Sequence, residues 1–571
     1  MNDMENRPTP IREVVLELLR PGPPHNQLLS PLTPYLALCS SHSAEVVHVP
    51  FEHWELQRRL QELGYRTSDR PGAIQEIAKT MGEIMGRVGG LGTELQANGG
   101  DAQPFVHLRL IISASELALL PWEIASAAKG FPGEGSPLSL QTVAPLCLTR
   151  EVRRPPGTQQ RWPTDARILF AYAAPGDSEV PFEAHLYALR RAIDPWVEPY
   201  DTNDSKQRQK ALGEHLEVLP NATLRDIQEA CARTRFTHVH ILAHGRETGE
   251  GERRRYGLAF HSQTSAGQPD VVEGERLAAA LISQPKENDG SPWHPAVVTV
   301  ASCESGNQGS VVYPGGSLAH DLHRAGIPLV VGSQFPLSFA GSVSMAEILY
   351  ERLLWGEDPR LALRDLRAQL RALYPATHDW ASIVAYVALP RDLARQLAEV
   401  QCERSLGALR LSMKHADDAL NISGRQDNLA IALKRVQRAL NRVPEIPGRE
   451  AETLCHKGAR LKRWGQVIFQ RWELERVTGN SISRSVAPGA NPSAVEKSRP
   501  EEYAKLEEAL ESYRRAFKST SAQDWKNIHW GGTQFLSLSA VLGKRVDAAD
   551  WNLCVAICER EVGDGSRIRS V

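Results

Sequence analysis

The chain has 571 residues, of which 42% are apolar and 23% charged, and its net charge is −2. This length exceeds what a single hydrophobic core serves, so several domains are expected. The near-neutral charge excludes a general electrostatic attraction to nucleic acid or to anionic lipid, so we expect a protein substrate and no nucleic-acid partner.

The cysteines and the N-terminus indicate a cytoplasmic protein. Eight cysteines are spread thinly along the chain, which is typical of proteins from a reducing compartment. The first residues contain no basic segment followed by an apolar stretch, so no signal peptide is expected. No uncharged apolar stretch approaches the roughly 18 residues that a membrane span needs, so we expect no contact with a membrane.

Residues 1–165 are expected to form an N-terminal α/β region. Apolar runs indicate strands, and apolar residues at helical spacing indicate helices. The strands are predicted at 13–19, 35–39 and 105–113, and the helices at 50–65 and 73–89.

A cluster of glycines after the second helix predicts a flexible connection there. Its members are Gly89, Gly90, Gly92, Gly99 and Gly100. Their spacing fits neither a dinucleotide-binding fingerprint nor a P-loop, so no nucleotide site is expected.

Residues 166–395 alternate apolar runs with helical segments, which predicts a mostly parallel sheet flanked by helices. The runs are nearly continuous, as in strands that helices cover on both faces. Ser317 is placed to cap one helix, and Gly356 is placed to end another. The predicted strands are ARILFAYA (166–173), FTHVHILAH (236–244), AVVTVAS (296–302), PLVVGSQ (328–334) and SIVAYVAL (382–389). The predicted helices are FEAHLYALRRAI (182–193), EGERLAAALI (273–282), SLAHDLHRAG (317–326) and SMAEILYERLLWG (344–356).

Residues 396–571 are predicted to be helical, because helix-forming residues recur at helical spacing. The segment EALESYRRAF (508–517) is similar to the second helix of a tetratricopeptide repeat, although no clean repeat period is found. A segment rich in Ser, Pro, Gly and Asn (481–500) is expected to be a flexible linker. We expect this region to bind a target, a regulatory protein or a ligand.

Two residues with reactive side chains follow apolar strands of the predicted sheet. His244 follows one strand and Cys303 follows the next predicted strand. Ligands of open parallel sheets bind at the carboxyl ends of the strands, where both residues are expected. A thiolate attacks a carbonyl carbon, and an imidazole favours the thiolate and protonates the leaving amine. The backbone N–H groups of Gly245 and Cys303 are the candidate oxyanion hole.

Six segments between residues 105 and 390 stand in the order found in a known family. They are LRLIISASELALLPWEIASA (108–127), ARILFAYAAPGD (166–177), HVHILAHG (238–245), VVTVASCESG (297–306), GIPLVVGSQFPLS (326–338) and ILYERLLWGEDPRLALRDLRAQL (348–370). His244 precedes Cys303 by 59 positions (303 − 244), close to the spacing of about 50 residues in caspases. In these segments the chain resembles the CHAT domain family, which comprises caspase-like cysteine peptidases of clan CD related to separase.

The resemblance implies a cysteine endopeptidase that cuts a specific protein target with a Cys–His dyad and no cofactor. It also implies activation by a partner or signal and a place in bacterial defence. Residues 166–395 would be the catalytic CHAT domain, and residues 1–165 would resemble a second, pseudo-caspase half. The caspase phrase Q-A-C-x-G is absent, because Ser302 stands where that phrase has Ala and Glu304 follows Cys303. This departure leaves the P1 preference open.

A pocket for a basic P1 residue would need a carboxylate. By their position near the cleft the candidates are Asp270, Glu273 and Glu304.

A metal site is the rival interpretation of the histidine pattern. His238, His240 and His244 are spaced like part of a metallo-hydrolase motif, but Leu242 and Ala243 stand where an acid is needed. We therefore interpret His238 and His240 as packing residues and predict no metal. Two further functions stay open, namely an inactive caspase-like signalling scaffold and a helical-repeat adaptor.

Overall fold

The computed structural model consists of two compact units. The sheet unit comprises residues 7–193 and 212–396, and the helical unit contains residues 194–211 and 397–571. The structure describes residues 11–21, 28–62, 70–96, 104–153, 161–176, 179–198, 200, 204–248, 255–264, 268–283, 292–301, 317–421, 426–444, 449–478, 500–519 and 525–563.

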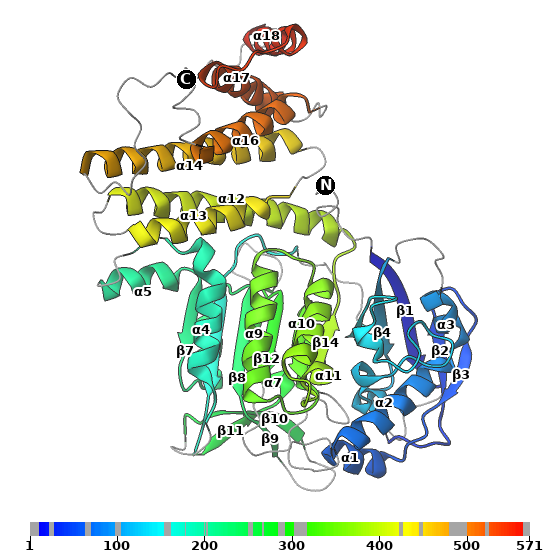
Figure 1. Cartoon of the computed structure of the whole chain (residues 1–571). Coiled ribbons are helices and arrows are strands. Elements are labelled where there is room, and N and C mark those ends of the chain that lie inside the picture. Colours follow the sequence, from blue (N-terminus) through cyan, green and yellow to red (C-terminus); the bar gives the residue numbers. More distant parts are fainter. Residues whose placement is uncertain are drawn as a thin grey trace. The chain divides into compact units, whose positions relative to one another are not determined.

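An eleven-stranded, mostly parallel sheet forms the centre of the sheet unit (Figure 1). Only three of its neighbouring strand pairs, β3–β2, β2–β1 and β14–β13, run antiparallel. The sheet, flanked by helices, confirms the predicted α/β fold class. In spatial order the strands are β3 (Glu45–His48), β2 (Pro34–Cys39), β1 (Ile11–Leu19), β4 (Phe105–Ile112), β5 (Leu146–Glu151), β14 (Ile383–Val387), β13 (Leu329–Ser333), β12 (Val297–Ala301), β8 (His238–Ala243), β6 (Ile168–Ala173) and β7 (Leu216–Leu219).

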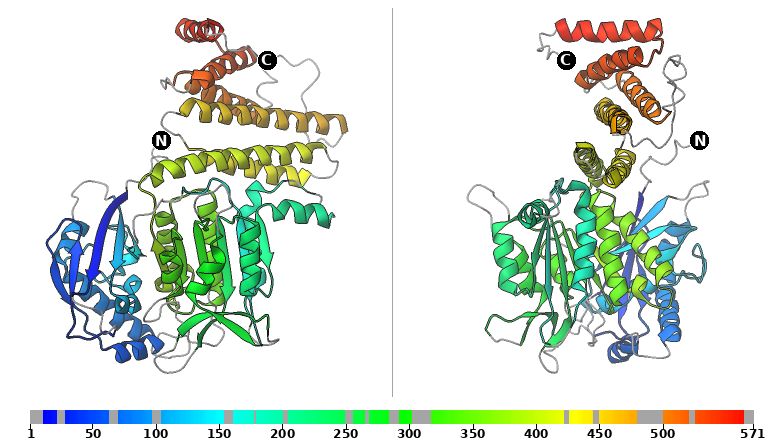
Figure 2. Two further views of the ribbon diagram at one scale, coloured as in Figure 1. Left: turned by 180° about the vertical axis from the view of Figure 1, so that it is seen from behind. Right: turned by 60° about the vertical axis from the view of Figure 1, so that its left-hand side comes forward.

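Helices cover both faces of this sheet (Figure 2). The helices α4 (Phe182–Ile193), α9 (Phe339–Leu354) and α10 (Pro359–Leu373) lie side by side on one face. The opposite face packs against α6 (Leu224–Arg233), α7 (Gly274–Leu281) and α8 (Leu318–Arg324). Further elements of the chain up to residue 382 are α1 (His53–Glu62), α2 (Arg70–Gly86), α3 (Gly89–Gln96), η1 (Ser115–Leu119), η2 (Trp122–Ile124), η3 (Leu138–Leu140), η4 (Asp194–Trp196), α5 (Ser205–Gly213) and α11 (Asp379–Ser382).

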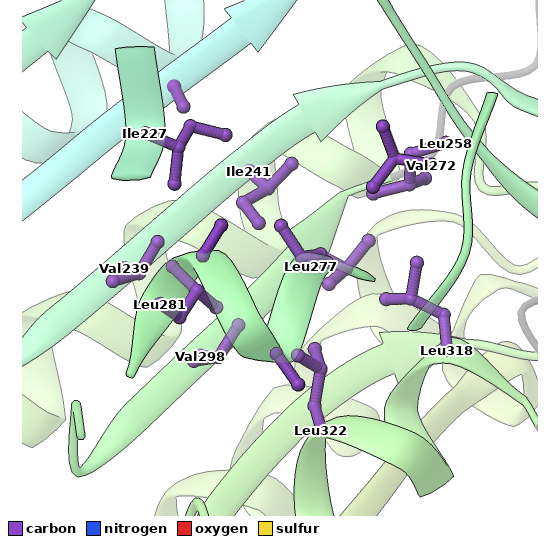
Figure 3. Packing of buried hydrophobic residues seen from close by; sticks show 14 of the residues in the cluster. Ile227, Val239, Ile241, Leu258, Val272, Leu277, Leu281, Val298, Leu318 and Leu322 are labelled. Carbon is purple, nitrogen blue, oxygen red and sulfur yellow. The ribbon is translucent and has the colours of Figure 1, made fainter. Parts of the chain in front are cut away.

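Alternate residues of the central strands build the core beneath α6, α7 and α8 (Figure 3). Val239 and Ile241 of β8 point to this side, together with Val298 and Val300 of β12. Because side chains alternate along a strand, the residues between them face α4 and α9. The face that α6, α7 and α8 cover is therefore apolar, whereas the face that α4 and α9 cover also holds buried polar groups.

Both predicted helix ends are confirmed. The Oγ of Ser317 accepts a hydrogen bond from the backbone N–H of His320 and caps α8. Gly356 adopts a φ of 78° just after α9, where a residue without Cβ avoids strain.

The last strand, β14, runs antiparallel to its neighbour β13, whereas the sequence predicted it as part of a parallel series. Residues of β14 pair antiparallel with β13, for example Val331 with Ala385. The long helices α9 and α10 and the short α11 separate these strands. The chain runs back along the sheet in α9, and α10 returns it to the end of the sheet where β13 finishes. A single crossover helix would have produced a parallel pair.

The prediction of a flexible connection at Gly89, Gly90 and Gly92 is wrong, because these residues lie in α3. The Glu45 carboxylate accepts hydrogen bonds from the backbone N–H groups of Gly89 and Gly90. A Cβ on Gly90 would lie 2.7 Å from the Cβ of His42. Glycine therefore permits a close approach of the helix to its neighbours, and a capping carboxylate offsets its poor helix propensity. Gly99 and Gly100 lie outside the described residues.

The helical unit confirms the predicted helices after residue 396. The connection between α4 and β7 also belongs to this unit, since the indole N–H of Trp196 donates to the Arg404 carbonyl over 3.0 Å and Arg435 pairs with Asp194 over 2.8 Å. Of the predicted linker (481–500), residues 481–499 lie outside the described residues, and Pro500 begins a helix. The helices are α12 (Leu393–Asn421), α13 (Gln426–Asn441), α14 (Glu450–Thr478), α16 (Pro500–Phe517), α17 (Trp525–Val541) and α18 (Ala548–Gly563).

Among the described residues, no helix combines the length and apolar composition that crossing a membrane requires.

Candidate active site

His244 lies at the carboxyl end of β8, directly after the buried residue Ala243. Its side chain is buried, and its Nε2 lies 3.1 Å from the backbone carbonyl oxygen of Glu179, in the connection between β6 and α4. A carbonyl oxygen can only accept, so Nε2 carries the hydrogen of this bond. In the neutral ring, Nδ1 is then left with the lone pair, which is the form that can accept a proton.

A small antiparallel sheet begins directly after His244. It consists of β9 (Gly245–Thr248), β10 (Arg255–His261) and β11 (Pro269–Val272), with β10 in the middle. The Ala259 N–H donates to the His244 carbonyl over 2.8 Å. Hydrogen-bonded and non-hydrogen-bonded pairs alternate in antiparallel ladders, so the next pair, Gly245 with Leu258, is not hydrogen-bonded. The N–H of Gly245 therefore points away from β10.

Cys303 lies outside the described residues, as do its neighbours Ser302 and Glu304. The last described residue before them is Ala301, the end of β12. This strand is parallel and adjacent to β8, and Ala301 pairs with Leu242. The structure thus describes one member of the predicted dyad and the strand that leads to the other.

The two remaining acids of the predicted substrate pocket lie near the small sheet. Asp270 is in β11, and both of its carboxylate oxygens accept hydrogen bonds of 2.9 Å from Arg276. Hydrogen bonding to Asp270 raises the pKa of Arg276. Glu273 is the residue before α7 and makes no side-chain cap to that helix. A substrate cation at Asp270 would have to replace the Arg276 guanidinium.

His238 and His240 of β8 are buried, with both rings next to Tyr350 of α9 and the His240 ring also stacked on His185 of α4. The Nδ1 of His240 lies 2.6 Å from the Thr299 hydroxyl, and its Nε2 lies 2.8 Å from Nδ1 of His185. The Thr299 hydroxyl is in turn 2.8 Å from that of Tyr350. Burial lowers the pKa of His185 to about 3 and that of His240 well below its usual value, so both rings are neutral. These contacts are those of packing residues.

A comparison with protein-family models matches residues 75–388 to the CHAT domain, which is more than half of the chain. The chain belongs to the CHAT domain family. The match contains His244, Gly245 and Cys303, and it begins within α2 and ends just after β14. No curated protein matches the chain.

A buried ion pair in the CHAT domain joins η2 to the sheet. The Nε of Arg150 donates to Glu123 over 2.9 Å, and neither side chain is exposed. Arg150 also donates to the side chain of Gln334 over 2.8 Å, and the Gln334 amide donates to the Leu119 carbonyl over 2.7 Å. Gln334 directly follows β13, the neighbour of β12. This cluster therefore fixes the carboxyl end of the sheet beside the strand that leads to Cys303.

Sequence reasoning did not find two of these features. The partner of His244 is the Glu179 carbonyl, a backbone group that every residue type supplies. The pairing of Arg150 with Glu123 joins residues of opposite charge that a sequence alone places on the surface. Glu123 lies in the segment 108–127 that resembles the CHAT family, and this resemblance was the available signal for it.

Proposed function

We propose that the chain is a cysteine endopeptidase in which Cys303 and His244 hydrolyse a peptide bond of a protein target. The pairing of β12 with β8 carries this proposal. Each paired residue of β12 stands 59 positions after its partner, as for Ala301 and Leu242 (301 − 242). His244 and Cys303 are also 59 positions apart (303 − 244). Two more residues of the same register would set them opposite each other.

The side-chain alternation supports the same conclusion. His240 and Thr299 face α4 and α9, and His244 and Cys303 follow them by four positions each. An even separation along a strand returns the side chain to the same face. A regular continuation would place the sulfur and the imidazole on one side of the sheet, as a dyad requires.

The proposed reaction begins with transfer of the thiol proton from Cys303 to Nδ1 of His244. The thiolate attacks the carbonyl carbon, and the resulting oxyanion accepts hydrogen bonds from the N–H groups of Gly245 and Cys303. The C–N bond breaks as the leaving amine takes the proton from Nδ1. Water then hydrolyses the thioester and regenerates the thiol. The Glu179 carbonyl keeps the imidazole oriented throughout by accepting from Nε2.

The helical unit is proposed to regulate the peptidase or to bind its target. Support comes from the segment between α4 and β7, whose residues Asp194 and Glu198 pair with Arg435 and Lys414 of the C-terminal helices. A partner that moved these helices would pull on the chain that follows α4. For the substrate we retain Asp270, Glu273 and Glu304 as the proposed contacts of a basic P1 residue, and we propose a cytoplasmic target, in bacterial defence.

Labelling of newly formed protein N-termini tests the function. Cells expressing the wild-type chain should contain cleavage products that cells expressing Cys303→Ala lack. Cleavage that persists in Cys303→Ala would refute the assignment. Equal N-termini in both strains, together with a Cys303 that no peptide-based electrophile labels, would instead support an inactive scaffold.

A further inference from the structure

The open edge of β9 begins at the proposed oxyanion donor. Since the pair Gly245–Leu258 is not hydrogen-bonded and pairs alternate, Arg246–Gly257 is hydrogen-bonded and Glu247–Tyr256 is not. The N–H and C=O groups of Gly245 and Glu247 therefore point away from β10. Among the described residues, no strand pairs with this second edge of β9.

The position of β10 indicates which way this edge faces. Residues of β10 contact β6, and the His261 N–H donates to the Ala222 carbonyl, which follows β7. Both β6 and β7 lie on the side of β8 opposite β12. The open edge of β9 is thus on the side of β12, the strand that precedes Cys303.

We propose that the substrate polypeptide binds in extended form as an added strand on the open edge of β9, an inference that rests on the proposed function. The Gly245 N–H would bind the carbonyl oxygen of the scissile bond, and the N–H and C=O of Glu247 would bind the substrate backbone two residues away. Two residues of a strand span about 6.8 Å, so the outward groups of β9 recur at the repeat of an extended peptide. Backbone hydrogen bonds would supply affinity that does not depend on the substrate's sequence.

Gly257 of β10 indicates that the small sheet of β9, β10 and β11 is closely packed. A Cβ there would lie 2.5 Å from the Val272 carbonyl oxygen, so β10 and β11 are packed as closely as backbone permits. Bidentate pairing of Arg276 with Asp270 holds β11 to the start of α7. A closely packed sheet holds the edge of β9 in place before the substrate binds, so binding does not carry the entropic cost of ordering that strand.

Proline substitution tests the added strand, because proline lacks the N–H and is tolerated at strand edges. Glu247→Pro removes the outward N–H of β9 and keeps every β9–β10 hydrogen bond. Val271→Pro is the matched control, since Val271 pairs with Ala259 in a non-hydrogen-bonded position and its N–H points outward from the opposite edge of the same sheet. Glu247→Ala controls for loss of the side chain.

The measurement is kcat/KM on an internally quenched octapeptide library, with far-UV circular dichroism and alkylation of Cys303 by iodoacetamide as checks on folding and site integrity. We expect Glu247→Pro to fall about tenfold below Glu247→Ala, as loss of a backbone hydrogen bond predicts, while Val271→Pro stays at the wild-type value. Equal values for Glu247→Pro and Glu247→Ala would overturn the added strand and leave the peptidase assignment standing. If the wild-type chain cleaves no peptide of the library and no peptide-based electrophile labels its Cys303, the peptidase assignment fails and the added strand fails with it.

Discussion

Nδ1 of His240 lies 2.6 Å from the hydroxyl of Thr299, directly across the boundary between β8 and β12. These residues stand four positions before His244 and Cys303, in the same register. The contact joins the two strands that carry the proposed dyad, inside a buried cluster that also contains His185, Ser342 and Tyr350.

Thr299→Val should destabilise the sheet unit. The substitution keeps the shape of the side chain but leaves His240 and Tyr350 without the hydroxyl between them. Buried polar groups that lose a partner cost roughly 1–3 kcal/mol. Urea unfolding would measure the loss. Ser262→Ala removes a hydroxyl whose contact with the Thr264 hydroxyl is exposed, so it serves as the control and should change the free energy of unfolding by no more than about 0.5 kcal/mol. Equal stabilities of Thr299→Val and wild type would show that the contact contributes nothing.

Arg150→Met should be far more harmful than the same substitution at the surface. It leaves the Glu123 carboxylate buried without its cation, and such a loss typically costs about 3–5 kcal/mol. Arg225 pairs with Glu229 on α6 with 67% and 58% of the side chains exposed, and Arg225→Met should cost less than about 1 kcal/mol. Thermal unfolding of the two variants gives the comparison, and similar melting temperatures would contradict it.

Stability should decline as the pH falls below about 6.5, the unperturbed value for histidine. Burial lowers the pKa of His185 to about 3, so the unfolded chain binds a proton there that the folded chain excludes. Between these two values each decrease in pH favours the unfolded state, and below pH 3 this contribution no longer changes. His185→Gln keeps a neutral polar side chain and should flatten the pH dependence of the unfolding free energy over this range. An unaltered slope would mean that His185 is not buried in its neutral form.

Gly90→Ala should destabilise the N-terminal part of the sheet unit. The new Cβ would meet the His42 side chain at 2.7 Å and the Cys39 Cβ at 3.2 Å. Overpacking of this kind costs about 1–3 kcal/mol. Gly213, at the end of α5, has no neighbouring atom within 4 Å of such a Cβ, so Gly213→Ala should be neutral or slightly stabilising. Differential scanning calorimetry would compare the melting temperatures of the two variants with that of wild type. A Gly90→Ala variant as stable as wild type would contradict the packing.

The predictable parts of the fold are those in which local pattern and tertiary environment agree. The strands β6, β8, β12 and β13 are nearly continuous apolar runs, as strands are when helices cover both faces of a sheet. Ser317 and Gly356 act within one helical turn, so their caps are readable from neighbouring residues. In contrast, α3 depends on Glu45, which is 44 positions from Gly89, and no local rule connects them.

The same distinction applies to the candidate site, where the sequence predicts some features and strand pairing determines the others. The position of His244 at the end of β8 follows from the apolar run before it. The carbonyl of Glu179 and the outward N–H of Gly245 depend on which strands pair and in which register, and this information is in the sheet rather than in residue types. The pairing of residues 194–198 with helices more than 200 positions later is tertiary in the same sense.

Alkylation of Cys303 in the presence and absence of the His244 imidazole tests the proposed dyad most directly. Iodoacetamide reacts with thiolates, so mass spectrometry of the Cys303 peptide over time at pH 6.5 reports whether an imidazole favours that form. His244→Ala should slow the reaction at least about tenfold relative to wild type, whereas His215→Ala, outside the site, should not. Equal alkylation rates in the wild-type chain and in His244→Ala would contradict the account.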